Sequence, residues 1–188
     1  IIGAMANKYR NSGQVCVSAN RIYVHESIYD EFSNRLAEKS SQLKVADGRT
    51  EGSQIGPLIT PQAFKKVEEH VEDAVEKGAK ILTGGTNDNS GLQFYKPTVL
   101  TDINSNMKIY YEETFGPVAP IIKFKHENEV IEMANDTKYG LAGYFYSRDI
   151  GKIWRVAEAL EYGMVGINAG VISTEVAPFG GIKESGIG

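Results

Sequence analysis

Short stretches of β-branched and aromatic residues alternate with longer amphipathic segments along the whole chain, and this alternation narrows the possible folds more than any other feature. Stretches of the first kind are typical of strands, and apolar residues at three-to-four spacing are typical of helices. Strands that alternate with helices predict an α/β fold with a sheet that is at least partly parallel. We expect strands at 21–25, 79–83, 97–100, 118–124, 141–146 and 164–167, and helices at 1–10, 27–43, 60–78, 130–134 and 149–163.

Capping signals define several of these helix boundaries. Thr60 and Pro61 supply an N-cap and a proline at the first helical position of the third helix, and Gly78 ends it. Ser27 with Asp30 forms an N-cap signature for the helix before it, and Asp149 is expected to cap the last one. These residues therefore predict where the chain passes from loop to helix.

Size and composition exclude several classes of protein. A chain of 188 residues has the size of one ordinary domain, and its longest apolar runs are too short to span a bilayer. The 20 basic and 24 acidic residues are interspersed, so we expect no nucleic-acid partner and no membrane partner. A single cysteine excludes an internal disulfide and a zinc cage, which favours a reducing, cytoplasmic setting.

Both ends of the chain indicate a piece of a longer protein. The chain opens on Ile1 without an initiator Met and without the basic region or cleavage site of a signal peptide. Residues 178–188 form a glycine-punctuated loop with no element to close it. We therefore expect residues 1–188 to be one domain of a larger chain.

Cys16 is the first candidate for chemistry, because a thiolate is the strongest protein nucleophile at neutral pH. The alternative is that a lone cysteine serves as a small buried hydrophobe. Asn11-Ser12-Gly13 stops the first helix just before Cys16, so this residue is expected where a helix gives way to a strand. Free backbone N–H groups in such a loop can stabilise an oxyanion.

Two further segments could belong to a site. Glu112 and Glu113 precede Phe115-Gly116-Pro117, and a carboxylate there could hold ribose hydroxyls or be a solvated surface group. Pro178-Phe179-Gly180-Gly181 could place an aromatic ring over a pocket or simply turn the chain. No phosphate-binding glycine motif occurs in the chain, so the part that would cradle a pyrophosphate is not expected here.

The three histidines predict no metal site. His25, His70 and His126 are far apart and fit no metal-ligand spacing. His70 is expected on the solvent-flanked part of its helix, where a structural role is the simpler interpretation.

Taken together, N-x-G-Q-x-C, E-E-x-F-G-P and P-F-G-G occur here in the order and at the spacing of the aldehyde dehydrogenase superfamily, which the whole chain resembles. The resemblance implies the three-layer catalytic domain of that family, with a mainly parallel sheet between helices. It implies that Cys16 is the nucleophile, that Glu113 binds the ribose of NAD or NADP, and that Phe115 lies beside the nicotinamide. It also implies that Phe179 lines the aldehyde pocket.

Within the superfamily the chain is similar to the succinate-semialdehyde dehydrogenases, through Tyr9-Arg10-Asn11 and the segment 170–178. That substrate carries a carboxylate far from its aldehyde, and a desolvated carboxylate needs a forked cationic donor such as Arg10, helped by a hydroxyl such as Ser173. The alternative for Arg10 is that it stabilises the C-terminus of its helix, where cations are favoured.

The chain also departs from the family. Ser18 stands where members of the subgroup often have a second cysteine, so no redox pair is expected. The family's cofactor-binding half, oxyanion-hole Asn, general-base Glu and subunit-pairing strand fall outside these residues, and the isolated chain is expected to be inactive. We expect the full-length protein to be a homo-oligomer. The alternatives are a dehydrogenase for another aldehyde and a non-catalytic module for subunit contact.

Overall fold

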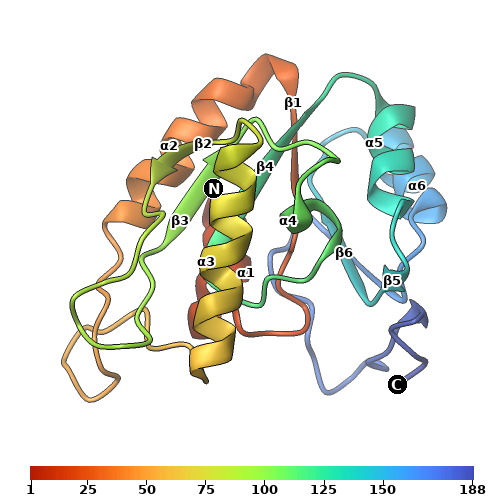
Figure 1. Cartoon of the computed structure of the whole chain (residues 1–188). Helices are drawn as coiled ribbons and strands as arrows, with labels where there is room; N and C mark the ends of the chain where they lie inside the picture. The colour runs from red at the N-terminus through yellow and green to blue at the C-terminus, as the bar shows by residue number, and fades with distance from the viewer.

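The structure is a computed structural model that describes all of residues 1–188, and it has the expected α/β fold (Figure 1). Its helices are α1 (Ile2–Tyr9), α2 (Tyr29–Ser41), α3 (Pro61–Glu76), α4 (Lys108–Tyr111), α5 (Glu127–Asn135) and α6 (Ile150–Ala159). Its strands are β1 (Ile22–His25), β2 (Lys80–Thr83), β3 (Thr98–Thr101), β4 (Val118–Phe124), β5 (Tyr139–Gly140), β6 (Ala142–Phe145), β7 (Met164–Ile167) and β8 (Ile182–Lys183). Two short 3₁₀ turns occupy Arg10–Gly13 and Glu26–Ile28.

The main sheet has four strands in the order β1-β4-β3-β2. Strand β4 lies between β1 and β3 and runs parallel to both, whereas β2 runs antiparallel to β3. A separate parallel pair is formed by β6 and β7. The strand pairing is therefore mainly parallel.

Helices cover both faces of the main sheet, because its central strands are apolar on both sides. Val99, Ala119 and Ile121 belong to one core cluster, which α1 and α2 complete. Their neighbours Leu100, Val118 and Ile122 belong to a second cluster with residues of α3 and α4. In Figure 1 the sheet consequently lies between two helical layers.

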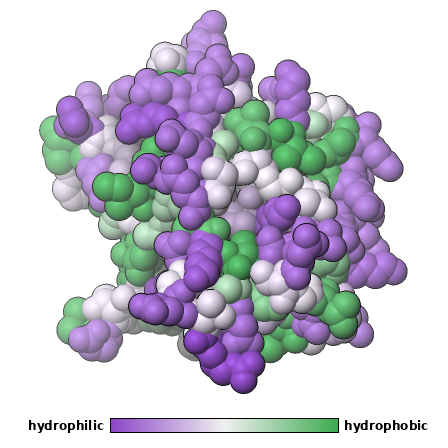
Figure 2. Space-filling view, turned by 90° about the vertical axis from the view of Figure 1, so that its left-hand side faces the viewer, coloured by the Kyte–Doolittle hydropathy of each residue, from purple (hydrophilic) through white to green (hydrophobic).

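A smaller part of the molecule lies beside the main sheet. Helices α5 and α6 lie together on the side of the molecule opposite α2, next to β5 and β6 (Figure 1). No residue of α5 or α6 is buried, and Trp154 of α6 is 63% exposed. No helix has both the length and the apolar composition needed to cross a membrane. The side of the molecule that carries α2, which faces the viewer in Figure 2, is mainly hydrophilic with smaller hydrophobic groups.

Two of the predicted caps are confirmed and one is wrong. The Thr60 side chain accepts a hydrogen bond from the Ala63 N–H, and Asp149 accepts one from the Lys152 N–H. Ser27 caps no helix, because its N–H and hydroxyl both bond the ring of His25, and α2 begins only at Tyr29. The histidine side chain thus takes the capping role at the preceding 3₁₀ turn.

The C-terminal loop is closed by an element that the sequence did not predict. Strand β8 pairs with β5, with Ile182 opposite Gly140 and Lys183 opposite Tyr139. The expected strand 141–146 is present as β6 (Ala142–Phe145), and β5 is a separate strand just before it. Strands of two residues are too short to show any periodicity, which is why the expectation of an unclosed loop was wrong.

Candidate active site

A tight reversal of the chain separates α1 from Cys16. Asn11, Ser12 and Gly13 have φ values of 49°, 58° and 75°, so three successive residues are left-handed. This conformation costs a non-glycine residue about 1–3 kcal/mol and persists only where the surroundings fix it. Here the Ser12 hydroxyl donates to the Gly56 carbonyl at 3.0 Å, and a Cβ on Gly13 would collide with the Gly116 carbonyl.

The reversal is also anchored by the next residue. The Gln14 side-chain oxygen accepts a hydrogen bond from the Ile59 N–H at 2.8 Å, and its nitrogen donates to the Pro57 carbonyl at 3.3 Å. The glycine and the glutamine of the N-x-G-Q-x-C motif are therefore structural residues that place the cysteine.

Asn7, in the last turns of α1, holds the segment that follows Cys16. Its side-chain oxygen accepts from the Ala19 N–H at 2.6 Å, and its nitrogen donates to the carbonyls of Val17, at 3.2 Å, and Gly170, at 2.9 Å. One buried amide thus joins the cysteine loop to the loop that carries Ser173 and Phe179. Sequence reasoning missed Asn7, whose only signal is an amide inside a helix, where this residue type is disfavoured.

Lys8 and Tyr144 complete the support beneath the cysteine loop. The Lys8 ammonium is fully buried and donates to the Ala19 carbonyl at 3.0 Å. Burial lowers the pKa of Lys8 to about 8, and the charge of Glu113 opposes this shift. The Tyr144 hydroxyl donates to the Val17 carbonyl at 2.9 Å. Sequence reasoning did not single out either residue.

Asn20 connects the cysteine loop to the E-E-x-F-G-P segment. Its side-chain nitrogen donates to the Glu112 carbonyl at 2.9 Å, and its oxygen accepts from the Thr114 N–H at 2.9 Å. The residues on both sides of Glu113 are therefore tied to the chain that follows Cys16. The two motifs, far apart in sequence, form one structure.

His70 lies in the interior, so the expectation that it flanks solvent was wrong. It is 2% exposed, and its ring lies between the Thr114 hydroxyl, 3.0 Å from Nδ1, and the Glu112 carboxylate, 3.3 Å from Nε2. Burial lowers the pKa of His70, and the hydrogen bond and charge of Glu112 oppose this shift. The physical reason is that the Thr114 loop covers this part of α3.

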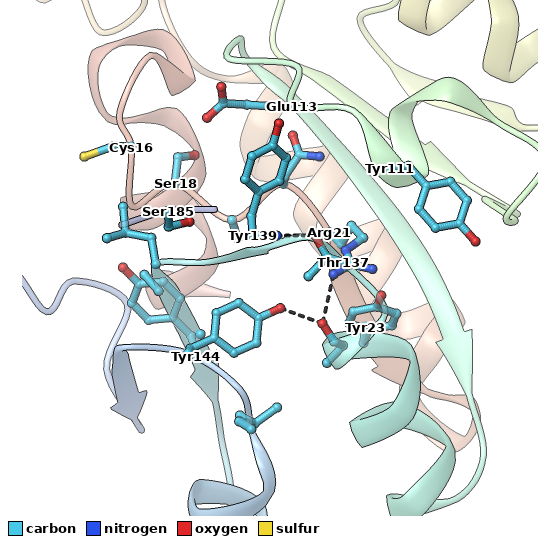
Figure 3. Close-up of a pocket in the computed structure, with 18 of the residues that line it drawn as sticks. Cys16, Ser18, Arg21, Tyr23, Tyr111, Glu113, Thr137, Tyr139, Tyr144 and Ser185 are labelled. Carbon is cyan, nitrogen blue, oxygen red and sulfur yellow. Dashed lines mark hydrogen bonds between the residues drawn. The ribbon is translucent and has the colours of Figure 1, made fainter. Parts of the chain in front are cut away.

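Cys16 and Glu113 line one cavity of about 420 Å³, bordered by β1 and β6 (Figure 3). Cys16 is exposed, which excludes the buried-hydrophobe alternative. Its N–H has no acceptor within the chain, and the Glu113 carboxylate has no hydrogen bond or ion pair there. The exposed cysteine and the carboxylate-bearing Glu113 thus line the same cavity.

The other candidate residues lie close by or on adjoining loops. Arg10 is exposed at the start of the 3₁₀ turn that precedes Cys16. Burial raises the pKa of Tyr144, and the charge of Arg10 opposes this shift. Phe115 has a φ of 51° just before Gly116. Ser173 is exposed, and Phe179 is 45% exposed and borders a second cavity of about 180 Å³.

No group of three or more His, Cys, Asp or Glu side chains is arranged to hold a metal ion. The Ser18 hydroxyl is buried without a hydrogen-bond partner.

Comparison with known proteins identifies the family. The model of the aldehyde dehydrogenase family matches residues 1–188. The chain is 55% identical to the NADP⁺-dependent succinate-semialdehyde dehydrogenase of Escherichia coli (strain K12), with 99% of this chain covering 39% of that protein. It is 57% identical to a glutarate-semialdehyde dehydrogenase of Pseudomonas putida, with 99% of this chain covering 38% of that protein.

Solved structures agree with this assignment. The crystal structure of succinate-semialdehyde dehydrogenase from Burkholderia pseudomallei superposes with a TM-score of 0.98 and 57% identity, over 100% of this chain and 39% of that one. The chain belongs to the aldehyde dehydrogenase family and has the fold of its catalytic domain. It spans about 39% of the length of these relatives.

Proposed function

We propose that the intact protein oxidises a dicarboxylic semialdehyde, preferentially succinate semialdehyde, to the dicarboxylate with NAD or NADP. The observation that carries this proposal is that the exposed thiol of Cys16 and the unpaired carboxylate of Glu113 line the same cavity. Asn20 joins the two loops, so their relative position is fixed. The relatives named for succinate and glutarate semialdehydes support this substrate class.

In the proposed reaction the Cys16 thiolate attacks the aldehyde carbon and forms a carbon–sulfur bond. The oxygen becomes an oxyanion, which accepts a hydrogen bond from the free Cys16 N–H. NAD(P) supplies the acceptor for the hydride that leaves the same carbon. The acyl group then remains on the Cys16 sulfur as a thioester, and water attacks it, breaks the carbon–sulfur bond and releases the carboxylate.

The residues present fit a bound dinucleotide. A carboxylate accepts hydrogen bonds from ribose hydroxyls, and the Glu113 carboxylate makes no hydrogen bond within the chain, although its charge acts on the buried Lys8 ammonium. Phe115 is our candidate for the wall beside the nicotinamide. In this proposal the groups that hold the pyrophosphate, complete the oxyanion hole and activate water come from outside residues 1–188.

The substrate carboxylate is assigned to Arg10 and Ser173, with Phe179 along the aldehyde pocket. A guanidinium matches a carboxylate with two parallel hydrogen bonds. The charge of Arg10 reaches Tyr144, whose hydroxyl bonds the cysteine loop, which supports a place for Arg10 near Cys16.

Two other functions are competing candidates. Glutarate semialdehyde is one methylene longer than the proposed substrate, and the Pseudomonas putida relative supports it. A hydrophobic pocket distinguishes one methylene by only about 1–3 kcal/mol, so the preference has to be measured. A non-catalytic module for subunit contact would leave Cys16 without enhanced reactivity.

The test is kcat/KM of the intact protein for succinate semialdehyde, glutarate semialdehyde and butanal, each with NAD⁺ and with NADP⁺. The proposal predicts that succinate semialdehyde exceeds butanal by about tenfold or more, because the carboxylate gains charge-assisted hydrogen bonds. Equal values for the acidic and neutral aldehydes would contradict the substrate class. Absence of turnover with every aldehyde would favour the non-catalytic module.

A further inference from the structure

His70 is a buried titratable group that the proposed chemistry does not use. It lies on α3, which packs on the sheet face opposite α1, and it is 2% exposed. Both ring nitrogens have partners in the E-E-x-F-G-P segment: Thr114 Oγ1 at 3.0 Å and Glu112 Oε2 at 3.3 Å. A buried ring with two partners in one loop fixes that loop to the helix.

The chemistry of the two partners determines which ring nitrogen of His70 carries a hydrogen atom. An ionised carboxylate only accepts hydrogen bonds, so Nε2–H donates to Glu112. In a neutral ring Nδ1 then accepts, and the Thr114 hydroxyl donates to it. The lowered pKa of His70, caused first by its burial, favours this neutral form at pH 7.

Asn20 holds the same loop through its backbone. Its amide bonds the Glu112 carbonyl and the Thr114 N–H, both at 2.9 Å. His70 therefore binds the side chains of Glu112 and Thr114, and Asn20 binds their backbone. Glu113 lies between these two fixed residues, and its own carboxylate has no partner.

We propose that His70 is a positioning residue for Glu113, acting through Thr114 and Glu112 to hold the loop in the conformation that binds the cofactor ribose. The inference rests on the proposed function, because it takes Glu113 to be the ribose ligand. A carboxylate on a fixed backbone loses less conformational entropy on binding than one on a free loop. Loss of the His70 hydrogen bonds should therefore weaken cofactor binding more than it affects the chemistry at Cys16.

The experiment measures the Kd for NADPH and NADH by fluorescence titration of the intact protein, together with thermal unfolding. His70→Phe and Thr114→Val should each raise Kd about five- to tenfold, the range expected for loss of one buried hydrogen bond with a polar partner. Thr114→Ser keeps the hydroxyl and should restore a Kd close to that of the wild type. The KM for NAD(P) should rise while the KM for the aldehyde stays unchanged.

A matched control uses the histidine that caps α5. His126 is the N-cap residue of α5, where its N–H donates to the Glu129 carboxylate at 3.1 Å, and it makes no hydrogen bond to the E-E-x-F-G-P segment, so His126→Ala should leave Kd unchanged. If His70→Phe does not fold, the comparison of Thr114→Val with Thr114→Ser carries the test alone. The double variant His70→Phe/Thr114→Val should raise Kd no more than the larger single effect, because both remove the same link.

The outcomes separate the two proposals. A wild-type protein that binds neither NADPH nor NADH would overturn the proposed function and this inference together. A wild-type protein that binds them, with an unchanged Kd in folded Thr114→Val, would overturn the role of His70 and leave the proposed function standing. A fall in unfolding temperature without a change in Kd would likewise overturn it, because His70 would then be structural only.

Discussion

The side-chain oxygen of Asn7 accepts a hydrogen bond from the Ala19 N–H at 2.6 Å, so the last turns of α1 hold the backbone that follows Cys16. The nitrogen of the same amide donates to Val17 and Gly170. A residue that does not touch the proposed substrate thus connects the cysteine loop with the segment that precedes Ser173.

Asn7→Ala should destabilise the protein and disorder the cysteine loop. Three hydrogen bonds are lost, one of them buried and two partly buried, which should lower the free energy of unfolding by about 2–3 kcal/mol. Denaturant unfolding and kcat of the intact protein measure both effects. Wild-type stability with wild-type kcat would contradict the structural role of Asn7.

Gly13→Ala should strongly destabilise the protein, although the substitution adds only one methyl group. Gly13 has a φ of 75°, and a Cβ there would collide with the Gly116 carbonyl. The left-handed backbone alone costs an alanine about 1–2 kcal/mol, before the collision is relieved. Gly48→Ala, where a Cβ meets nothing, is the matched control. Comparable unfolding midpoints for the two variants would refute the close packing of Gly13 on Gly116.

Arg10→Gln should raise the KM for succinate semialdehyde about tenfold or more and leave the KM for butanal unchanged. The reason is the loss of a charge-assisted, forked contact with the substrate carboxylate. Arg35→Gln, on the exposed surface of α2, should change neither value. An equal rise for both aldehydes would assign Arg10 to the stability of the α1 terminus instead.

Lys8 should make stability depend on pH in the mildly alkaline range. Its pKa is about 8 in the folded protein and ordinarily 10.5, so the unfolded chain binds more protons between these values. The free energy of unfolding therefore rises with pH in that window, by about 1 kcal/mol between pH 7 and pH 9 from this group. Lys8→Met should lack this increment when unfolding is compared at both pH values, whereas an identical pH dependence would contradict the lowered pKa.

Helices with a capping residue and a clear apolar stripe were predicted correctly from the local sequence. Thr60 caps α3 as expected, and the apolar stripe through Val67 and Val71 is buried. His70 follows Val67 by three residues and precedes Ala74 by four, so its position on the buried face of α3 could have been predicted from this spacing. The expectation of a solvent-flanked histidine gave more weight to residue type than to position.

The supports of the cysteine loop could not be predicted in the same way. Asn7 and Lys8 are buried because residues 16–20 fold back over α1, a contact that no local periodicity encodes. Asn20 acquires its role only when Thr114 lies beside it. The motifs therefore identified the candidate chemical groups, and the tertiary fold determined which residues hold them in place.

In the proposed reaction Cys16 carries the acyl group during turnover. The intact protein is mixed with succinate semialdehyde and NADP⁺ or NAD⁺, quenched with acid within one turnover, digested and analysed by mass spectrometry. The expected result is a succinyl adduct on the peptide that contains Cys16, and no adduct and no turnover in Cys16→Ala. Turnover that persists in Cys16→Ala, or an adduct on another residue, would contradict it.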